Sequence, residues 1–450
     1  MKSLLSCALL SACIACAAAV ADPREVPATR EFALAQPFPA DAVLGGIFVH
    51  DLDKDGHMDF VVSSEGHVGA YRHDGESLWV WKGNIRLFEY SHHPSVIAGN
   101  LDGGNDEEVA FLLEDFTLQV LNAANGEAKY QLNNLGRPVA IGVANLRGLG
   151  DQDIVLQYDL THLRAIQGED GKTLWETHDY KSIEHSPFRQ ADLDGDGLDE
   201  IAGAALIDHG GKLMHEWVLD GRHESMDSIV IADIEPGGPL EVALAEQRGA
   251  NSHTDVVNCE RILWRTLNPW NWEDPDKLVA GDFDPERPGL EVFNRSSGGD
   301  GVAPRGEEEP FVEEEAPWVL DAHGELIMKY YVNDKKPEWW TGHGLEEIFR
   351  IDWDGDAKDE LAGKERHKVG AGAIVDAITG EFLFVFRVNA VRFYVADIEE
   401  DSREEVIVLD ESGLIKVFAN AAPNPHAPKP SPWKRSEYRR QKQNWNYYSP

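Results

Sequence analysis

Short acidic segments that could bind a divalent cation recur along the chain. The best example begins at Asp192 and runs DLDGDGLDE, with carboxylates at its first, third and fifth positions, a glycine for the turn and a carboxylate at its end. Hard cations such as calcium prefer oxygen ligands in this kind of arrangement. An apolar run, 201–207, follows at once. The segment therefore predicts a cation-binding loop that leads into a β-strand.

This unit occurs eight times. Copies begin at positions 51, 100, 145, 192, 233, 282, 352 and 397, with spacings of 49, 45, 47, 41, 49, 70 and 45 residues. Apolar, β-branched stretches flank each copy, and turn signals such as Asn125-Gly126 follow. Roughly four short strands per 40 to 50 residues is the signature of a propeller blade. The repeats predict an all-β protein, a β-propeller of four-stranded blades. Motif count favours eight blades, with seven as the alternative if the degenerate copy at Asn145 merges with a neighbour.

Three copies keep enough carboxylates to hold a cation, and the copy at Asp397 is weaker because it lacks the glycine. We expect structural calcium in these three loops; the alternative is an acidic turn without an ion. The predicted ligands are Asp51, Asp53, Asp55 and Asp59 in the first loop, Asp192, Asp194, Asp196 and Glu200 in the second, and Asp352, Asp354, Asp356 and Glu360 in the third.

The N-terminus has the features of an export signal. Residues 1–21 contain one lysine, an apolar stretch and a small-residue cleavage site, Ala19-Val20-Ala21. The alternative is lipoprotein processing at Cys13, since Leu10-Ser11-Ala12-Cys13 resembles a lipobox. Three of the four cysteines lie in this leader, which excludes a disulfide framework. We expect a secreted or periplasmic protein, with no further segment apolar enough to span a membrane.

The charge balance is strongly acidic. The chain has 41 Lys and Arg against 80 Asp and Glu, a net charge of −39. This excess argues against general binding of nucleic acid, and it means that an anionic ligand needs a local basic site. The chain is expected to be a monomer.

The acidic repeats resemble the FG-GAP or VCBS type of propeller repeat over nearly the whole mature chain, 22–420. In that family the cation loop joins the innermost strand of a blade to the second strand. The resemblance therefore implies that the loops lie on one face and that the inner strands begin at a funnel on the other face. Histidines cluster at these expected strand beginnings: His92, His93, His185, His223 and His343.

Two further groups fall on the same expected face. Arg189 is four residues after His185 and should share its orientation, because side chains alternate along a strand. In the third blade the second strand returns to the funnel with Tyr158, His162 and Arg164. An arginine clamp for a carboxylate, with His and Tyr as proton-transfer groups, is a recognisable chemical set. Arg164 as an exposed turn charge is the alternative.

Aromatic residues provide candidate sugar platforms. Trp339 and Trp340 lie just before His343, at the start of an expected inner strand. The C-terminal region, 421–450, begins rich in proline and ends WKRSEYRRQKQNWNYYSP, which is basic and aromatic in an otherwise acidic chain. We expect this tail to pack on the propeller.

The combination of a signal peptide, HSPFRQADLDGDGLDE, GDFDPERPGLEVF and RRQKQNWNYYSP resembles the secreted propeller polysaccharide lyases, namely the ulvan lyases and the rhamnogalacturonan lyases. That resemblance implies β-elimination on a uronic-acid-containing anionic polysaccharide. It implies His93 as the base, Tyr158 as its acid or base partner, Arg189 (or Arg164) as carboxylate neutraliser and His185 in support.

The remaining candidates are assigned to substrate binding: His92, His162, Arg164, His223, Trp339, Trp340 and His343. Rhamnogalacturonan lyases of this shape use calcium near the substrate, so the metal role could extend to catalysis. The short chain without appended domains favours ulvan as first choice and rhamnogalacturonan as second. The alternative from a different class is a non-catalytic, calcium-stabilised propeller that binds glycan or protein; a cell-envelope scaffold is a third possibility.

Overall fold

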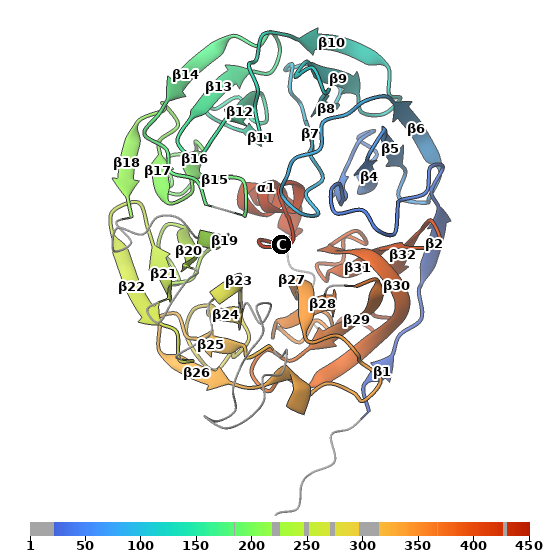
Figure 1. Ribbon diagram of the computed structural model, residues 1–450, viewed down its shortest axis with the longest axis vertical. Helices are drawn as coiled ribbons and strands as arrows, with labels where there is room; N and C mark the ends of the chain where they lie inside the picture. Colours follow the sequence, from blue (N-terminus) through green and yellow to red (C-terminus); the bar gives the residue numbers. More distant parts are fainter. Residues whose placement is uncertain are drawn as a thin grey trace, which may run out of the picture.

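The fold is built almost entirely from β-strands, which form sheets arranged in a ring (Figure 1). The computed structural model describes residues 22–183, 185–217, 226–246, 252–270, 275–296, 315–366, 368–425 and 430–450. The all-β prediction is confirmed. The predicted leader, 1–21, lies outside the described residues.

Six antiparallel sheets of four strands follow one another along the chain. In each sheet the strands are added in sequence order, with the first strand near the centre of the ring and the fourth at the rim (Figure 1). The first three sheets contain β3 (Ile47–His50), β4 (Asp59–Ser64), β5 (His67–Tyr71) and β6 (Ser77–Lys82); β7 (Val96–Gly99), β8 (Glu108–Leu112), β9 (Leu118–Asn122) and β10 (Ala128–Leu132); and β11 (Ala140–Ala144), β12 (Asp153–Gln157), β13 (Leu163–Gln167) and β14 (Thr173–Thr177).

The next three sheets have the same order of strands. They contain β15 (Arg189–Ala191), β16 (Glu200–Ala202), β17 (Ala205–Ile207) and β18 (Leu213–Glu216); β19 (Met226–Ala232), β20 (Glu241–Glu246), β21 (His253–Val257) and β22 (Ile262–Leu267); and β23 (Pro275–Gly281), β24 (Glu291–Ser296), β25 (Trp318–Leu320) and β26 (Leu326–Lys329).

The last two repeats share a single eight-stranded sheet, which the sequence did not predict. Its centre is β30 (Phe382–Ala396), a strand of 15 residues. The first part of β30 pairs with β29, and its part from Ala390 onward pairs with β31. Strand β2, near the N-terminus, pairs with β32, the last strand along the chain, while β1 runs beside β30. The other members are β1 (Arg24–Glu25), β2 (Arg30–Ala33), β27 (Leu345–Ile351), β28 (Glu360–Glu365), β29 (Gly370–Val375), β31 (Glu405–Asp410) and β32 (Leu414–Phe418).

One hydrogen bond recurs in all eight acidic repeats. The carboxylate that begins the second strand of the repeat accepts the backbone N–H of the residue seven positions earlier. This bond closes each loop whether or not the loop keeps the other carboxylates, so the degenerate copy at Asn145 folds like its neighbours. The accepting residues are Asp59, Glu108, Asp153, Glu200, Glu241, Glu291, Glu360 and Glu405.

The first strands of the sheets meet around the centre of the ring, where β7 contacts β11, β19 contacts both β15 and β23, and β27 contacts β23 and β30. Apolar side chains fill the space between neighbouring sheets, and the largest buried cluster joins the first two sheets to the eight-stranded sheet. Burial of this interface closes the ring through packing as well as through the pairing of β2.

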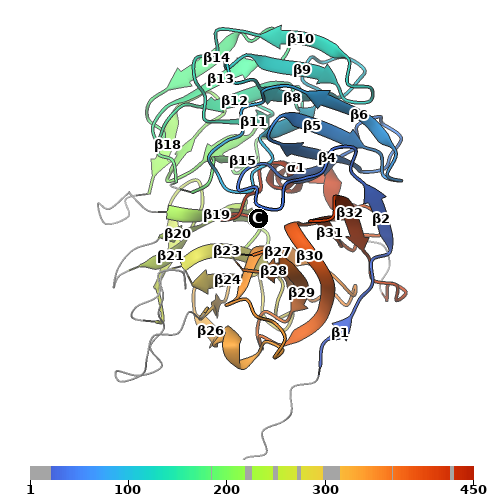
Figure 2. The same ribbon diagram turned by 45° about the vertical axis from the view of Figure 1, so that its right-hand side comes forward.

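The C-terminal segment occupies the centre of the ring. It contains the turn η2 (Pro432–Lys434) and the helix α1 (Ser436–Gln443), and both views place α1 and the C-terminus at the centre (Figure 1 and Figure 2). Gln443 bonds the backbone of Ala98, and Gln441 that of Ile231, so the helix is held by strands from different sheets. A second short turn, η1 (Val332–Asp334), follows β26.

Among the described residues, no helix has the length and apolar character needed to cross a membrane.

Candidate functional site

Two neighbouring hollows lie at the face where the first strands of the sheets begin. The first, here called the His185 hollow, has a volume of about 500 Å³ and its polar lining is Arg86, Glu89, Tyr90, Ser91, His185 and Tyr448. The second, the Lys364 hollow, has a volume of about 330 Å³ and is lined by His92, Glu346, Lys364, Lys368, Arg392 and Tyr447, among others. The two hollows adjoin because Ser91 and Tyr448 line both.

His185 is paired with a buried carboxylate. Its Nδ1 lies 2.5 Å from Oδ1 of Asp227, which is fully buried on β19, while the side chain of His185 remains 35% exposed. When Nδ1 carries the proton, the carboxylate accepts it and so orients the ring. The ring of Tyr448 stacks on the imidazole at 4.4 Å with an interplanar angle of 16°. The arrangement is suited to proton transfer in the hollow.

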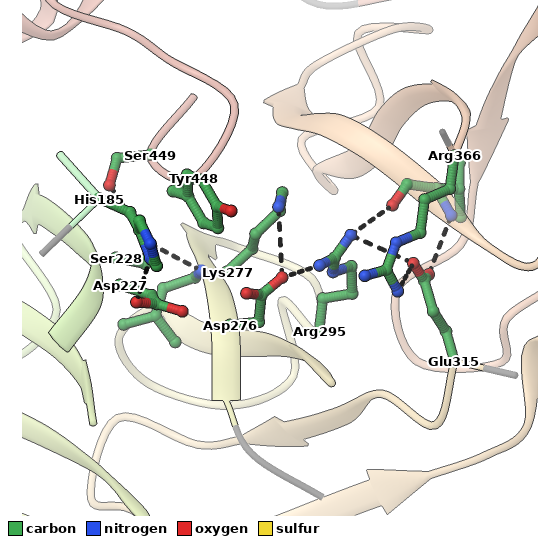
Figure 3. Close-up of polar contacts among 12 residues, drawn as sticks. His185, Asp227, Ser228, Asp276, Lys277, Arg295, Glu315, Arg366, Tyr448 and Ser449 are labelled. Carbon is green, nitrogen blue, oxygen red and sulfur yellow. Dashed lines mark hydrogen bonds and ion pairs between the residues drawn. The ribbon is translucent and has the colours of Figure 1, made fainter. Parts of the chain in front are cut away.

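A chain of buried ion pairs lies beside His185 (Figure 3). Asp276 binds both Lys277 and Arg295, and Glu315 binds Arg295 at 3.2 Å and Arg366 at 3.1 Å. Three basic side chains thus share these two carboxylates, and all of the groups are buried beside the hollows.

Lys277 links this chain of charges to the C-terminal tyrosines. Its Nζ lies 3.4 Å from the centre of the Tyr447 ring and 4.4 Å from that of Tyr448. Burial lowers the pKa of Lys277 well below its usual value, and the charge of Arg366 acts in the same direction. The tyrosine rings thus lie between the buried cations and the two hollows.

The Lys364 hollow has its own charged pairs. Lys364 Nζ bonds Glu346, and His92 Nδ1 contacts the buried carboxylate of Glu347. Burial lowers the pKa of His92 well below its usual value and raises the pKa of Glu347 to about 7. The structure thus places His92, predicted to bind substrate, at a hollow.

His93, the base implied by the resemblance, is sealed inside the protein. Its ring is fully buried, its Nδ1 accepts the N–H of Ser95 at 2.8 Å, and burial lowers its pKa to about 3. Arg189 is also buried: it donates to the backbone oxygens of Asn444 and Ser449, and burial lowers its pKa to about 9. These placements correct the expectation that both side chains face the cleft, because the C-terminal segment covers Arg189 and the 86–95 loop encloses His93.

Tyr158 does not line either hollow. Its hydroxyl donates to Leu135 O, and its ring stacks on His162 at 4.4 Å. Burial raises the pKa of Tyr158. Of the four predicted catalytic residues, His185 is the one that lines either of these two hollows.

The remaining predicted substrate-binding residues lie in different surroundings. His162, just before β13, bonds Glu176 on β14 at 2.7 Å, and Arg164 on β13 bonds Thr173 on β14 at 3.0 Å. Trp340 is buried in the core, and Arg387 already lies 3.4 Å over the ring of Trp339, so an open sugar platform is not formed there. His343 is exposed beside Glu315, and His223 lies outside the described residues.

The acidic loops bring their carboxylates together as expected for cation ligands. Ligand atoms lie within 4.8 Å of one another for Asp51, Asp53 and Asp59, for Asp192, Asp194 and Glu200, and for Asp354, Asp356 and Glu360. Asp55, Asp196 and Asp352 accept backbone N–H groups within their loops. Oδ1 of Asp51 and Oε1 of Glu200 are buried without a hydrogen-bond partner. Unpartnered buried carboxylate oxygens of this kind fit a bound hard cation.

Several residues of the site were missed from the sequence. Asp227, Lys277 and Arg295 lie at strand ends without a local motif, whereas the NWNYYSP ending was noticed only as a packing segment. Arg86 was also missed. It precedes His92 and His93, which were identified from their place before the acidic repeat, and Arg86 could have been identified in the same way.

No family model matches the chain. Its sequence is 26% identical over 512 residues to the rhamnogalacturonan endolyase YesW of Bacillus subtilis (strain 168), covering 91% of this chain and 75% of that protein. It is 22% identical over 400 residues to the rhamnogalacturonan exolyase YesX of the same organism, covering 68% of this chain and 60% of the relative. These similarities support a polysaccharide lyase.

The fold is also similar to a solved structure of such a lyase. The crystal structure of the exotype rhamnogalacturonan lyase YesX superposes with a TM-score of 0.69 at 22% identity, covering 93% of this chain and 80% of that one. The similarity extends over the ring of sheets and is therefore not limited to the acidic repeats.

Proposed function

We propose that this protein is a polysaccharide lyase that cleaves a rhamnogalacturonan-type polysaccharide by β-elimination next to a uronic acid. The observation that carries the proposal is sequence similarity to a rhamnogalacturonan endolyase over 91% of the chain. The comparisons give no support to ulvan, which the sequence favoured first, so rhamnogalacturonan takes its place. The protein would act outside the cell or in the periplasm, with 1–21 as its export signal.

The ring is interpreted as an eight-bladed β-propeller in which the seventh and eighth blades share β30. Eight acidic loops with the same hydrogen bond support this count. The three carboxylate clusters are proposed calcium sites. These loops lie at the ends of the first strands, whereas the two hollows lie at their beginnings. We therefore assign calcium a structural role at the face opposite the hollows.

Within the His185 hollow we assign the proton-abstracting base to His185. Its Nε2 would take the proton from carbon five of the uronic acid while Asp227 holds Nδ1. The electron pair left on carbon five forms the double bond to carbon four, and the bond from carbon four to the leaving oxygen breaks. The leaving oxygen then takes a proton, and the product carries an unsaturated sugar.

Arg86 is the proposed partner for the substrate carboxylate. It lines the His185 hollow, and its Nε is buried with no hydrogen-bond partner among the described residues. Its guanidinium lies 4.6 Å from the centre of the Phe116 ring, which fixes the group without neutralising it. A fixed cation stabilises the charge that develops on the carboxylate as the proton leaves.

The test is an assay of unsaturated product by ultraviolet absorbance with rhamnogalacturonan, homogalacturonan and ulvan as substrates. We expect product from rhamnogalacturonan, and a decrease of about 10²- to 10⁴-fold in His185→Ala, the usual contribution of general acid–base catalysis. Arg86→Gln should lose activity as well. His323→Ala is the matched control, since His323 is exposed at 65% and lies on another sheet.

Three results would count against the proposal. Activity on ulvan alone would restore the first choice from the sequence. Full activity in His185→Ala would remove the assigned base. Absence of product from every polymer, with folded protein and added calcium, would favour the non-catalytic glycan- or protein-binding alternative.

A further inference from the structure

Three side chains at the outer edge of the third sheet converge on one point. Ligand atoms of His162, Glu176 and His178 lie within 4.8 Å of one another. None of the three residues belongs to an acidic loop, and none of them lines either hollow described above. The cluster differs from the acidic loops in its chemistry, because two of its three donors are imidazoles.

The register of the two strands explains why the side chains meet. Leu163 on β13 pairs with Thr177 on β14, and Arg164 pairs with Glu176. Continued by one residue, this register sets His162 opposite His178. Glu176 and His178 are two residues apart and so point to the same face of the sheet. All three donors therefore come from directly opposed or diagonal positions, where cross-strand side chains are within reach of each other.

The first histidine is held firmly in place. Asp159 accepts the backbone N–H groups of Thr161 and His162, which fixes the turn. The His162 ring lies between Tyr158 at 4.4 Å and His178 at 4.2 Å, and its Nε2 is 2.7 Å from Oε1 of Glu176. His178 and Glu176 are exposed and can rotate toward a ligand.

We propose that His162, Glu176 and His178 form a binding site for a divalent transition metal such as Zn²⁺. Two imidazoles and a carboxylate are a donor set that first-row divalent metals bind, and calcium is not expected to compete because it prefers oxygen ligands. Tetrahedral zinc with bonds of about 2.0 to 2.1 Å requires ligand atoms about 3.3 Å apart, which rotation of the exposed side chains can reach. A fourth position would remain open to water. The metal would tie the turn between β12 and β13 to the outermost strand β14.

The experiment uses untagged full-length protein, freed of metal by a chelator and supplied again with calcium. Zn²⁺ binding is measured by calorimetry, and Co²⁺ binding by its visible ligand-field absorption, which reports nitrogen coordination. In the presence of excess calcium, we expect Zn²⁺ to bind at one site besides those that calcium occupies. We expect Co²⁺ to bind at the same site. His178→Ala and Glu176→Gln should each weaken this site at least about tenfold, and His162→Ala, in which a ring of the stack is also lost, should abolish it.

Two controls separate this site from other histidines. His323→Ala removes an exposed histidine on another sheet and should leave binding unchanged. His209→Ala removes a histidine that lies near Asp196 and Glu200, and should also leave the site intact. Equal Zn²⁺ affinity in His178→Ala and in the unaltered protein would overturn the proposal, as would displacement of Co²⁺ by calcium. The outcome does not depend on lyase activity.

Discussion

Replacing Trp445 tests whether the C-terminal segment holds the ring closed. Trp445 is fully buried, and its Nε1 donates to Ile47 O on β3 at 2.5 Å. Its ring lies 5.7 Å from those of Phe349 on β27 and Tyr394 on β30. One side chain thus contacts the first sheet and both halves of the eight-stranded sheet, so its loss should weaken the closure.

The magnitude follows from the burial. Replacing a fully buried tryptophan by alanine costs about 3 to 5 kcal/mol. The entropy of unfolding, about 2.1 cal/mol/K per residue, gives roughly 0.9 kcal/mol/K for a 450-residue chain. Trp445→Ala should therefore lower Tm by about 3 to 6 °C. Trp445→Phe keeps most of the packing but loses the hydrogen bond to Ile47, and should cost about 1 kcal/mol from that bond plus a smaller packing term.

The assay is thermal unfolding followed by circular dichroism and calorimetry, with the calcium concentration held constant. Trp339→Ala is the comparison variant, because Trp339 is only partly buried and lies under Arg387, away from the C-terminal segment. We expect a clearly smaller shift in this control. If Trp445→Ala shifts Tm no more than Trp339→Ala, the C-terminal segment does not close the ring and the reasoning is refuted.

Three further predictions address charged groups. Burial lowers the pKa of folded His93 to about 3, so the unfolded chain binds a proton at this residue first as the pH falls. His93 should therefore contribute a loss of roughly 3 kcal/mol between pH 7 and 4, and urea titrations of His93→Asn should show a change over this range that lacks this contribution. Arg440→Met leaves the carboxylates of Asp151 and Asp199 unpaired and should cost about 3 to 5 kcal/mol in urea unfolding; a loss below about 1 kcal/mol would contradict the pairing. Glu200→Gln should reduce the rise of Tm on adding calcium, whereas Glu241→Gln, at the same position of a loop expected to hold no cation, should leave that rise unchanged.

The repeats could be predicted from sequence because their determinants are local. Each loop is closed by a hydrogen bond between residues seven positions apart, as from Leu193 N to Glu200. A carboxylate at that spacing therefore marks the start of a second strand in every copy. The sharing of β30 by two repeats could not be predicted in this way, because the acidic motif marks loops and does not reveal where one strand passes into the next sheet.

The C-terminal contacts were hidden for a different reason. Arg189 bonds Ser449, 260 residues later, and Ser186 bonds the same residue through its hydroxyl. Strand parity predicted that Arg189 shares the orientation of His185, but it could not indicate that the end of the chain covers Arg189. A basic and aromatic tail in an acidic protein was the available signal, and it predicted packing without predicting the partners.

His93 and His185 show most directly where reasoning from repeats ends. Both lie seven residues before an acidic motif, so the repeats treat them as equivalent. In the structure His93 is enclosed by Phe88 and bonded to Ser95, whereas His185 meets Asp227 and Tyr448 and remains 35% exposed. The repeat determines at which position of a sheet a side chain is attached. The neighbouring sheet and the C-terminal segment determine what surrounds that side chain. The neighbouring repeat supplies Asp227 and the C-terminal segment supplies Tyr448, and these two contacts distinguish the surroundings of His185 from those of His93.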